Sequence, residues 1–122
     1  MSKRAGTIEI KVDGRLFEAV GSFTYSLGKP TREALLGHDS VHGYKELPSV
    51  PFIEGEFRDG AGVSLDDIAN ITDATVTLSL ANGKVIVLRN AWCTNPDGLG
   101  AGTEDGNIAV RFEGKKGEEV SA

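Results

Sequence analysis

Two short turns, each set between stretches of alternating apolar and polar residues, constrain the fold of this chain more than any other feature. The first turn is Asp13-Gly14 and the second is Asn82-Gly83. Such pairs favour the two-residue turns that join antiparallel strands, because both central residues must adopt positive φ angles. Alternation with a period of two places apolar side chains on one face of a strand. The sequence therefore predicts antiparallel β-hairpins.

Alternation elsewhere gives the bounds of the expected elements. We expect strands at residues 8–12, 15–27, 52–58, 75–80, 84–92 and 107–112. Gly21 indicates a bulge or a bend in the second of these. Val85 to Leu88 is apolar on both faces, which is typical of a central strand. Ser64 can cap a short helix from about Leu65 to Ile71. The predicted class is mostly β: a β-sandwich or barrel of antiparallel strands with one short helix.

Composition supports one compact unit of this class. A chain of 122 residues fits one domain, so we expect residues 1–122 to form a single domain. Hydrophobic residues make up 39% and charged residues 25%, which are ordinary values for a globular protein. The 16 glycines favour many strands joined by tight connections, because glycine suits turns and weakens helices.

Charge and cysteine content argue against several classes of protein. The formal net charge of −5 does not suit a protein that grips phosphate backbones, since nucleic-acid binding draws on clustered Lys and Arg. The lone Cys93 reads as a small buried hydrophobe. No apolar run approaches the roughly 20 residues that span a bilayer, and no signal peptide is evident. We therefore expect synthesis in a reducing cytoplasm and no membrane partner.

The segment at about 28–50 shows no sustained periodicity and is long for an ordinary connection. Within it, Thr31–Leu36 is compatible with one strand or one helical turn. Its apolar side chains have little use in a solvated linker, so we interpret it as an assembly loop that packs against another subunit. The residues assigned to this contact are Pro30, Leu35, Leu36, Tyr44, Leu47, Pro48 and Val50. Residues 1–5, 95–106 and 114–122 are expected to be a frayed end, a surface loop and a polar tail.

Several side chains are capable of chemistry, but their spacing does not favour a catalytic or metal site. Glu54 and Glu56 share one face of a strand, about 6 to 7 Å apart along it, and glycosidases use paired carboxylates at such separations. Those acids need a cleft with aromatic walls, which nothing here indicates. His38 and His42 have a spacing that aligns metal ligands only on a helix. We predict a solvated acidic face, no catalytic residue, no metal and no cofactor.

Three stretches resemble the Mu-type tail tube proteins of contractile-tailed phages. One is the hairpin Ile8-Glu-Ile-Lys-Val-Asp-Gly-Arg-Leu-Phe. Another is a loop rich in turn formers that runs into a strand with acidic alternate positions, Val41-His-Gly-Tyr-Lys-Glu-Leu-Pro-Ser-Val-Pro-Phe-Ile-Glu-Gly-Glu. The third is Leu65-Asp-Asp-Ile-Ala-Asn-Ile-Thr-Asp-Ala-Thr-Val-Thr-Leu. The resemblance runs roughly from Gly6 to Glu113 and is specific in order and spacing.

The resemblance implies a structural protein of the virion tail, assembled in the host cytoplasm. Members of this family are similar in fold, a β-sandwich-like barrel with a short helix, and form hexameric rings that stack into a hollow tube. Strands from all six subunits line the lumen, and DNA passes through without specific binding. The implied partners are further copies of the chain, the tail sheath protein, the tape-measure protein in the lumen during assembly, and the baseplate and tail terminator proteins.

Strand alternation suggests which side chains face such a lumen. These residues are acidic or carry hydroxyl groups and lie opposite apolar neighbours: Glu9, Glu18, Ser22, Thr24, Glu54 and Glu56. Our hypothesis is that they repel DNA phosphates, so that DNA slides without sticking.

Three other functions fit parts of the sequence. The chain is also compatible with the tube protein of a phage-derived bacteriocin or of a type VI secretion system. A small monomeric β-sandwich that binds carbohydrate or peptide is another interpretation, although an aromatic fraction of 7% is low for stacking on sugars. A hydrolase that uses Glu54 and Glu56 would need a concave pocket.

Overall fold

The structure is a computed structural model that describes residues 8–60, 64–94 and 106–121. These residues form nine strands and one short helix. The elements are β1 (Glu9–Val12), β2 (Arg15–Ser26), β3 (Thr31–Leu36), β4 (Val41–Leu47), β5 (Phe52–Arg58), α1 (Leu65–Ala69), β6 (Ala74–Ser79), β7 (Lys84–Cys93), β8 (Asn107–Glu113) and β9 (Lys116–Ser121). The predicted mostly-β class is confirmed. The expected frayed end and nearly all of the expected surface loop lie outside the described residues.

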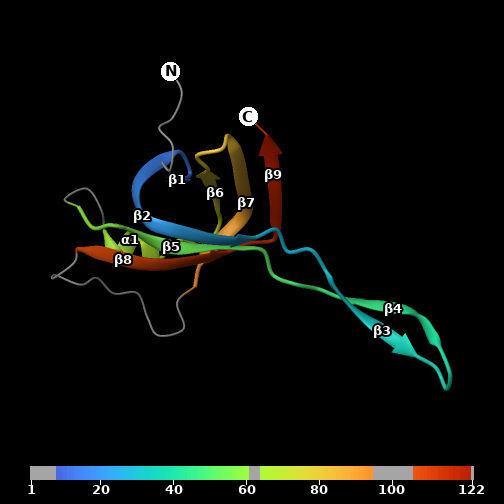
Figure 1. Ribbon diagram of the computed structural model, residues 1–122. Helices are drawn as coiled ribbons and strands as arrows, with labels where there is room; N and C mark the ends of the chain where they lie inside the picture. Colours follow the sequence, from blue (N-terminus) through green and yellow to red (C-terminus); the bar gives the residue numbers. More distant parts are fainter. Residues whose placement is uncertain (1–7, 61–63, 95–105, 122) are drawn as a thin grey trace.

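Six strands close into a barrel (Figure 1). They follow the order β6-β1-β2-β5-β8-β7, and β6 also pairs with β7, which completes the ring. β9 pairs with β7 as well, so β7 is a central strand, as its apolar residues predict. Ile86 and Leu88 of β7 are buried in the core, while Val85 and Val87 are half-buried on the other face.

The apolar side chains that alternate along the strands fill the barrel. The largest fully buried side chains are Phe57, Phe112, Ile10, Ile53, Leu78, Ile86, Leu88, Ile108 and Val76. Phe17 packs on Phe57 with ring centroids 4.8 Å apart. Helix α1 adds Ile68 to this core, and Ser64 caps the helix by accepting a hydrogen bond from the amide of Asp67 at 3.3 Å. Burial of each large apolar side chain stabilises the fold by roughly 1.5–3 kcal/mol.

The first predicted turn is confirmed and the second differs in detail. Asp13 and Gly14 have φ angles of 51° and 84°, as a two-residue hairpin turn requires. The connection between β6 and β7 is longer than two residues. There the amide of Gly83 donates to the carbonyl of Leu80 at 3.1 Å, and Gly83 has a φ of 92°. This is a turn followed by a glycine in the left-handed region, another common hairpin connection.

Residues 28–50 contain an ordered hairpin where the sequence predicted a loop without sustained periodicity. β3 and β4 pair antiparallel, from Thr31 opposite Leu47 to Leu36 opposite Val41. Figure 1 shows this segment, called the arm below, projecting away from the barrel. Every residue of β3 and β4 is exposed. Strands that bury neither face have no reason to alternate apolar and polar residues, which is why periodicity did not reveal them.

Residues 116–121 form β9 where the sequence predicted a polar tail. β9 pairs with β7 from Lys84 to Arg89. Ion pairs join Arg89 to Glu118 at 2.6 Å and Lys84 to Glu119 at 3.8 Å. Backbone hydrogen bonds and ion pairs attach β9 to β7, so the strand does not need a row of buried apolar side chains. Its sequence therefore lacks the apolar alternation by which a strand is predicted.

Candidate functional site

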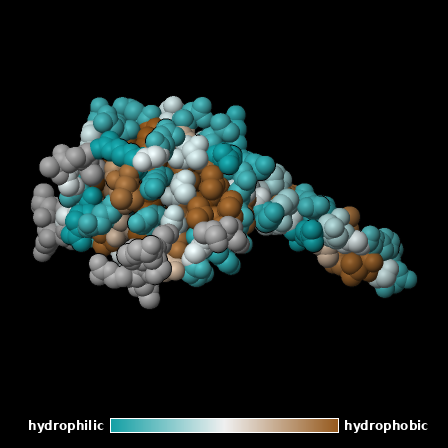
Figure 2. Space-filling model, turned by 90° about the horizontal axis from the view of Figure 1, so that it is seen from above, coloured by the Kyte–Doolittle hydropathy of each residue, from teal (hydrophilic) through white to brown (hydrophobic). Residues whose placement is uncertain are grey.

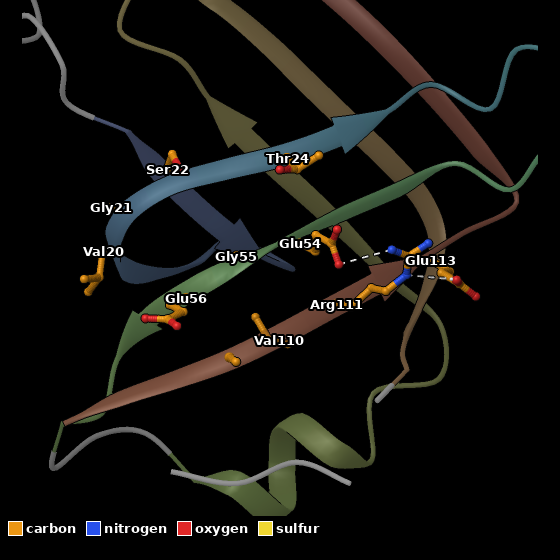
Figure 3. A pocket seen from close by; sticks show the side chains of 11 residues that line it. Val20, Gly21, Ser22, Thr24, Glu54, Gly55, Glu56, Val110, Arg111 and Glu113 are labelled. Atoms are coloured by element: carbon orange, nitrogen blue, oxygen red, sulfur yellow. Dashed lines mark hydrogen bonds and ion pairs between the residues drawn. The ribbon is translucent and has the colours of Figure 1, made fainter. Parts of the chain in front are cut away.

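The outer face of β2, β5 and β8 is hollowed into a groove of about 890 Å³. Four of the six residues predicted to face a channel line it: Ser22, Thr24, Glu54 and Glu56 (Figure 3). Glu54 lies opposite Thr24 of β2 on one side and opposite Arg111 of β8 on the other. Because directly opposite residues share a face of the sheet, strand alternation gathers these polar side chains on one surface.

The backbone of β2 and β5 shapes this groove. The register between the two strands shifts between Val20 and Thr24, where Gly21 has a φ of 67°, and the bulge or bend predicted at Gly21 corresponds to this shift. Gly55 lies on β5 opposite the bulge. A Cβ on Gly55 would lie 2.6 Å from the ring of Phe23, which is too close. Glycine at this position therefore makes room for the Phe23 ring.

Arg111 is a cation within the groove that the sequence analysis did not select. Its guanidinium lies 3.1 Å from Glu54, 3.1 Å from Glu113, and 4.0 Å from the centroid of the Phe52 ring. Partial burial opposes the charge of Arg111, but its hydrogen bonds to Glu113 and Glu54 outweigh this and raise the pKa of the guanidinium. Strand alternation could have identified it, because the neighbouring Phe112 is buried and Arg111 must point outward.

The other two predicted channel residues, Glu9 and Glu18, lie outside this groove. They are opposite each other in the pairing of β1 with β2 and line a second groove of about 520 Å³. Gly21 lines both grooves, so the two are neighbours. Arg58 donates to Glu18 at 2.5 Å in an exposed pair, which contributes little to stability. The six predicted residues therefore form two adjacent groups.

The two carboxylates considered for hydrolysis have separate partners. Arg111 binds Glu54, whereas the side-chain amide of Asn107 donates to Glu56 at 3.3 Å. An open groove with two carboxylates engaged in this way does not favour a glycosidase. Within residues 8–60, 64–94 and 106–121, no group of three or more His, Cys, Asp or Glu side chains is arranged to hold a metal ion. The same ranges contain no helix with the length and apolar character needed to cross a bilayer.

The arm carries the residues predicted for contact with another subunit, and all of them are exposed. They are Pro30, Leu35, Leu36, Tyr44, Leu47, Pro48 and Val50. Leu36 is 77% exposed and lies opposite Val41, which is 64% exposed and was not predicted. Figure 2 shows apolar surface near the tip of the arm, where these two residues lie. The guanidinium of Arg32 lies 4.9 Å from the ring centroid of Tyr44, which is a cation–π contact between β3 and β4.

The base of the arm packs closely against the barrel. Gly28 has a φ of 76°, and a Cβ there would lie 2.7 Å from the ring of Pro51, which is buried. Gly117 of β9 lies against the same base, since a Cβ there would be 3.0 Å from the backbone of Leu27. Leu27 itself packs against the core. The arm is thus exposed along its length but anchored where it leaves the barrel.

Comparison with known proteins decides what kind of molecule carries these surfaces. Residues 1–119 match the phage tail tube protein family. The chain belongs to that family. One tail tube relative, the Mu-like prophage FluMu tail tube protein of Haemophilus influenzae, is 28% identical over 107 residues, which cover 88% of this chain and 87% of the relative. The predicted resemblance to Mu-type tail tube proteins is confirmed.

A solved structure shares the fold of this tail tube protein. The tube-terminating cap of the anti-feeding prophage, determined by cryo-EM, aligns with a TM-score of 0.64 at 12% identity and covers 100% of this chain and 94% of the cap. Likeness at this level of identity supports the fold alone. Family membership makes the chain a structural component of a phage tail, and it implies a non-enzymatic role, self-assembly into a tube and partners within the tail.

Proposed function

We propose that copies of this chain form hexameric rings, and that the rings stack into the inner tube of a contractile tail through which DNA passes during ejection. The arm is the observation that carries this proposal. It is an ordered hairpin with an exposed apolar tip, anchored at its base and covered by nothing else in the described chain. An isolated two-stranded hairpin is marginally stable in water, whereas burial of its apolar tip by a neighbouring subunit would stabilise it.

A strand edge supports joining of subunits through backbone hydrogen bonds. In the described part of the chain, β1 pairs with β2 only over Arg15–Glu18, and β2 beyond that point pairs with β5 alone. A strand paired on one side offers its free donors and acceptors to another chain. We infer that a strand of the neighbouring subunit adds to this edge, so that six subunits together line the lumen.

The groove face is the surface that we place toward the lumen. Its three carboxylates (Glu54, Glu56 and Glu113) outnumber its guanidinium group, that of Arg111, and Ser22 and Thr24 add hydroxyl groups. Exposed charges act over about 8 Å at physiological salt, so a net acidic wall repels nearby phosphates. DNA would then slide past without specific binding. Glu9 and Glu18 extend the acidic surface into the second groove.

The other proteins that contact this chain follow from its proposed position as the inner tube of a contractile tail. We propose that the tail sheath protein surrounds the tube, that the tape-measure protein occupies the lumen during assembly, and that baseplate and tail terminator proteins bind the two ends. Assembly would take place in the host cytoplasm. Family membership supports partners of this general kind.

Negative-stain electron microscopy of the purified, concentrated protein tests the proposal. We expect hollow tubes or rings with six-fold symmetry, and size-exclusion chromatography should show a concentration-dependent assembly. A protein that stays monomeric at every salt and protein concentration would contradict self-assembly. Closed rings with another subunit number would refute the hexamer while leaving the tube in place.

A further inference from the structure

Arg111 lines a groove that, under the function proposed above, must not hold phosphate. A free guanidinium binds phosphate well, because its N–H groups form a fork that matches two oxygens. In this chain two of the five N–H donors of Arg111 are engaged by carboxylates. Nε donates to Glu113 and a terminal nitrogen donates to Glu54, each at 3.1 Å. We propose that Glu54 and Glu113 mask Arg111, so that the groove contains an arginine but offers little phosphate binding through it.

The mask is built into the register of the strands. Glu54 lies directly opposite Arg111 in the pairing of β5 with β8, and Glu113 is two residues further along β8 on the same face. Phe52 lies opposite Glu113 and completes a square of four side chains, with its ring beneath the guanidinium. Figure 3 shows both ion pairs at one end of the groove. A change of register between β5 and β8 would separate the cation from Glu54, whereas Glu113 would stay beside it on β8.

The environment of this cluster strengthens the mask. The side chain of Arg111 is 29% exposed and that of Glu113 is 25% exposed. Arg58 of β5, which does not line this groove, has a side chain that is 56% exposed and pairs with one carboxylate, Glu18, that is 66% exposed. Charges that are partly removed from water attract each other more strongly, so the groove holds Arg111 more firmly than an ordinary surface pair would.

A double variant removes the mask without changing its shape. Glu54→Gln with Glu113→Gln keeps the size of both side chains and leaves an amide oxygen beside Arg111, but it removes both negative charges. Binding of a short fluorescent double-stranded oligonucleotide to the dilute, unassembled protein is measured by fluorescence anisotropy at low salt. We expect the double variant to bind about tenfold more tightly than the original protein, the effect of one hydrogen bond to a charged group. The gain should disappear when Arg111→Gln is added.

A second control, beside Arg111→Gln, separates unmasking of Arg111 from a general loss of repulsion between the protein and DNA. Asp66→Asn with Asp67→Asn removes the same number of negative charges from α1, which does not line the groove. We expect this variant to bind the oligonucleotide no more than marginally better than the original protein. An equal gain in this control, or a gain that survives Arg111→Gln, overturns the masking proposal.

The single variant Glu113→Gln covers the case in which the double variant does not fold, as judged by circular dichroism. It should show a smaller gain of the same sign, and a folded single variant without any gain also overturns the proposal. Because the measurement uses unassembled protein, masking can fail while tubes still form. Conversely, a failure to form tubes contradicts the proposed function and leaves the binding result intact.

Discussion

At the scale of single residues, Asp13 joins a turn to a strand in another hairpin. Its amide donates to the carbonyl of Thr75 and its Oδ1 accepts from the amide of Thr75, both at 2.8 Å. Its φ of 51° lies in the left-handed region, which Asp and Asn tolerate better than other residues with a side chain. One side chain therefore supports the tight turn between β1 and β2 and fixes the start of β6 beside it.

Asp13→Ala should destabilise the fold by about 1–2 kcal/mol, because it removes one hydrogen bond and places alanine in the left-handed region. Asp13→Asn keeps both the amide-accepting oxygen and the tolerance for positive φ, so it should cost much less. Urea denaturation followed by tryptophan fluorescence measures both variants. Equal losses in the two variants would mean that neither the acceptor nor the backbone conformation explains the role of Asp13.

At the scale of elements, we expect the barrel to fold without the arm and the arm to be needed only for assembly. Replacing residues 31–47 with a short Gly-Ser turn removes no residue of the core. We expect a variant that unfolds with nearly the original midpoint but no longer assembles into tubes. Leu36→Ser with Val41→Ser is the milder test, since it alters only the apolar tip. Tubes formed by the deletion variant would show that the arm has no part in assembly.

β9 should respond to acid through Glu118. Its hydrogen bond from Arg89 lowers the pKa of the Glu118 carboxyl in the folded chain. A lowered folded pKa means that the stabilisation is complete above the unfolded value, near 4.3, and is lost as the pH falls through the folded value. The stability difference between the original protein and Glu118→Gln should therefore shrink between about pH 6 and pH 3. Unfolding curves of both proteins across this pH range measure the difference in free energy of unfolding. A difference that stays constant with pH would show that the Arg89–Glu118 pair does not stabilise β9.

The sequence was sufficient for elements with one buried face and insufficient for the others. Ile10 and Phe112 are buried and alternate with charged neighbours that are not, because one side of their strands faces the core, so both strands were predicted. The arm and β9 bury no continuous face, so β3, β4 and β9 were missed or left open. Cys93 was predicted to be buried and is half-buried: it packs against the core, and burial raises the pKa of its thiol.

For the candidate site, alternation along the strands predicted which side chains point away from the core. It did not predict which of these side chains lie close together on the surface. Thr24 and Glu54 share a groove because β2 and β5 happen to be neighbours, and this pairing connects distant parts of the sequence. Glu9 belongs to another groove because β1 pairs with the first part of β2, before the bulge. Arg111 occupies an equally outward position on β8, but the prediction included only acidic and hydroxyl side chains.

At the scale of the whole molecule, the barrel presents one grooved face and extends one arm. If the groove lines the lumen of a tube, its residues become enclosed on assembly while remaining open to small solutes. Thr24 lies on this face and is exposed in the single chain. Its accessibility should therefore depend on the size of the reagent and on the state of assembly.

Thr24→Cys in a Cys93→Ala background tests this enclosure. In the unassembled protein, a small maleimide and a maleimide attached to a large protein should both react with the new cysteine. In tubes, only the small reagent should react at the original rate, with the large one slowed at least about tenfold, which corresponds to 1.4 kcal/mol. Equal labelling of tubes by the large reagent would place Thr24 on the outside. Glu9→Cys, treated in the same way, reports on the second groove separately.

The contact of Gly117 with Leu27 and Pro51 means that the last strand of the chain helps to aim a hairpin made from its middle. Trimming the chain before residue 116 would look harmless if that stretch were a loose tail. Instead it would remove the contact of Gly117 with Leu27 and Pro51 at the base of the arm, and the orientation of the arm relative to the barrel would no longer be fixed on that side. A subunit shortened in this way would keep its core yet point its arm in a wrong direction, so a change in the last strand would disturb contacts that the tip of the arm makes.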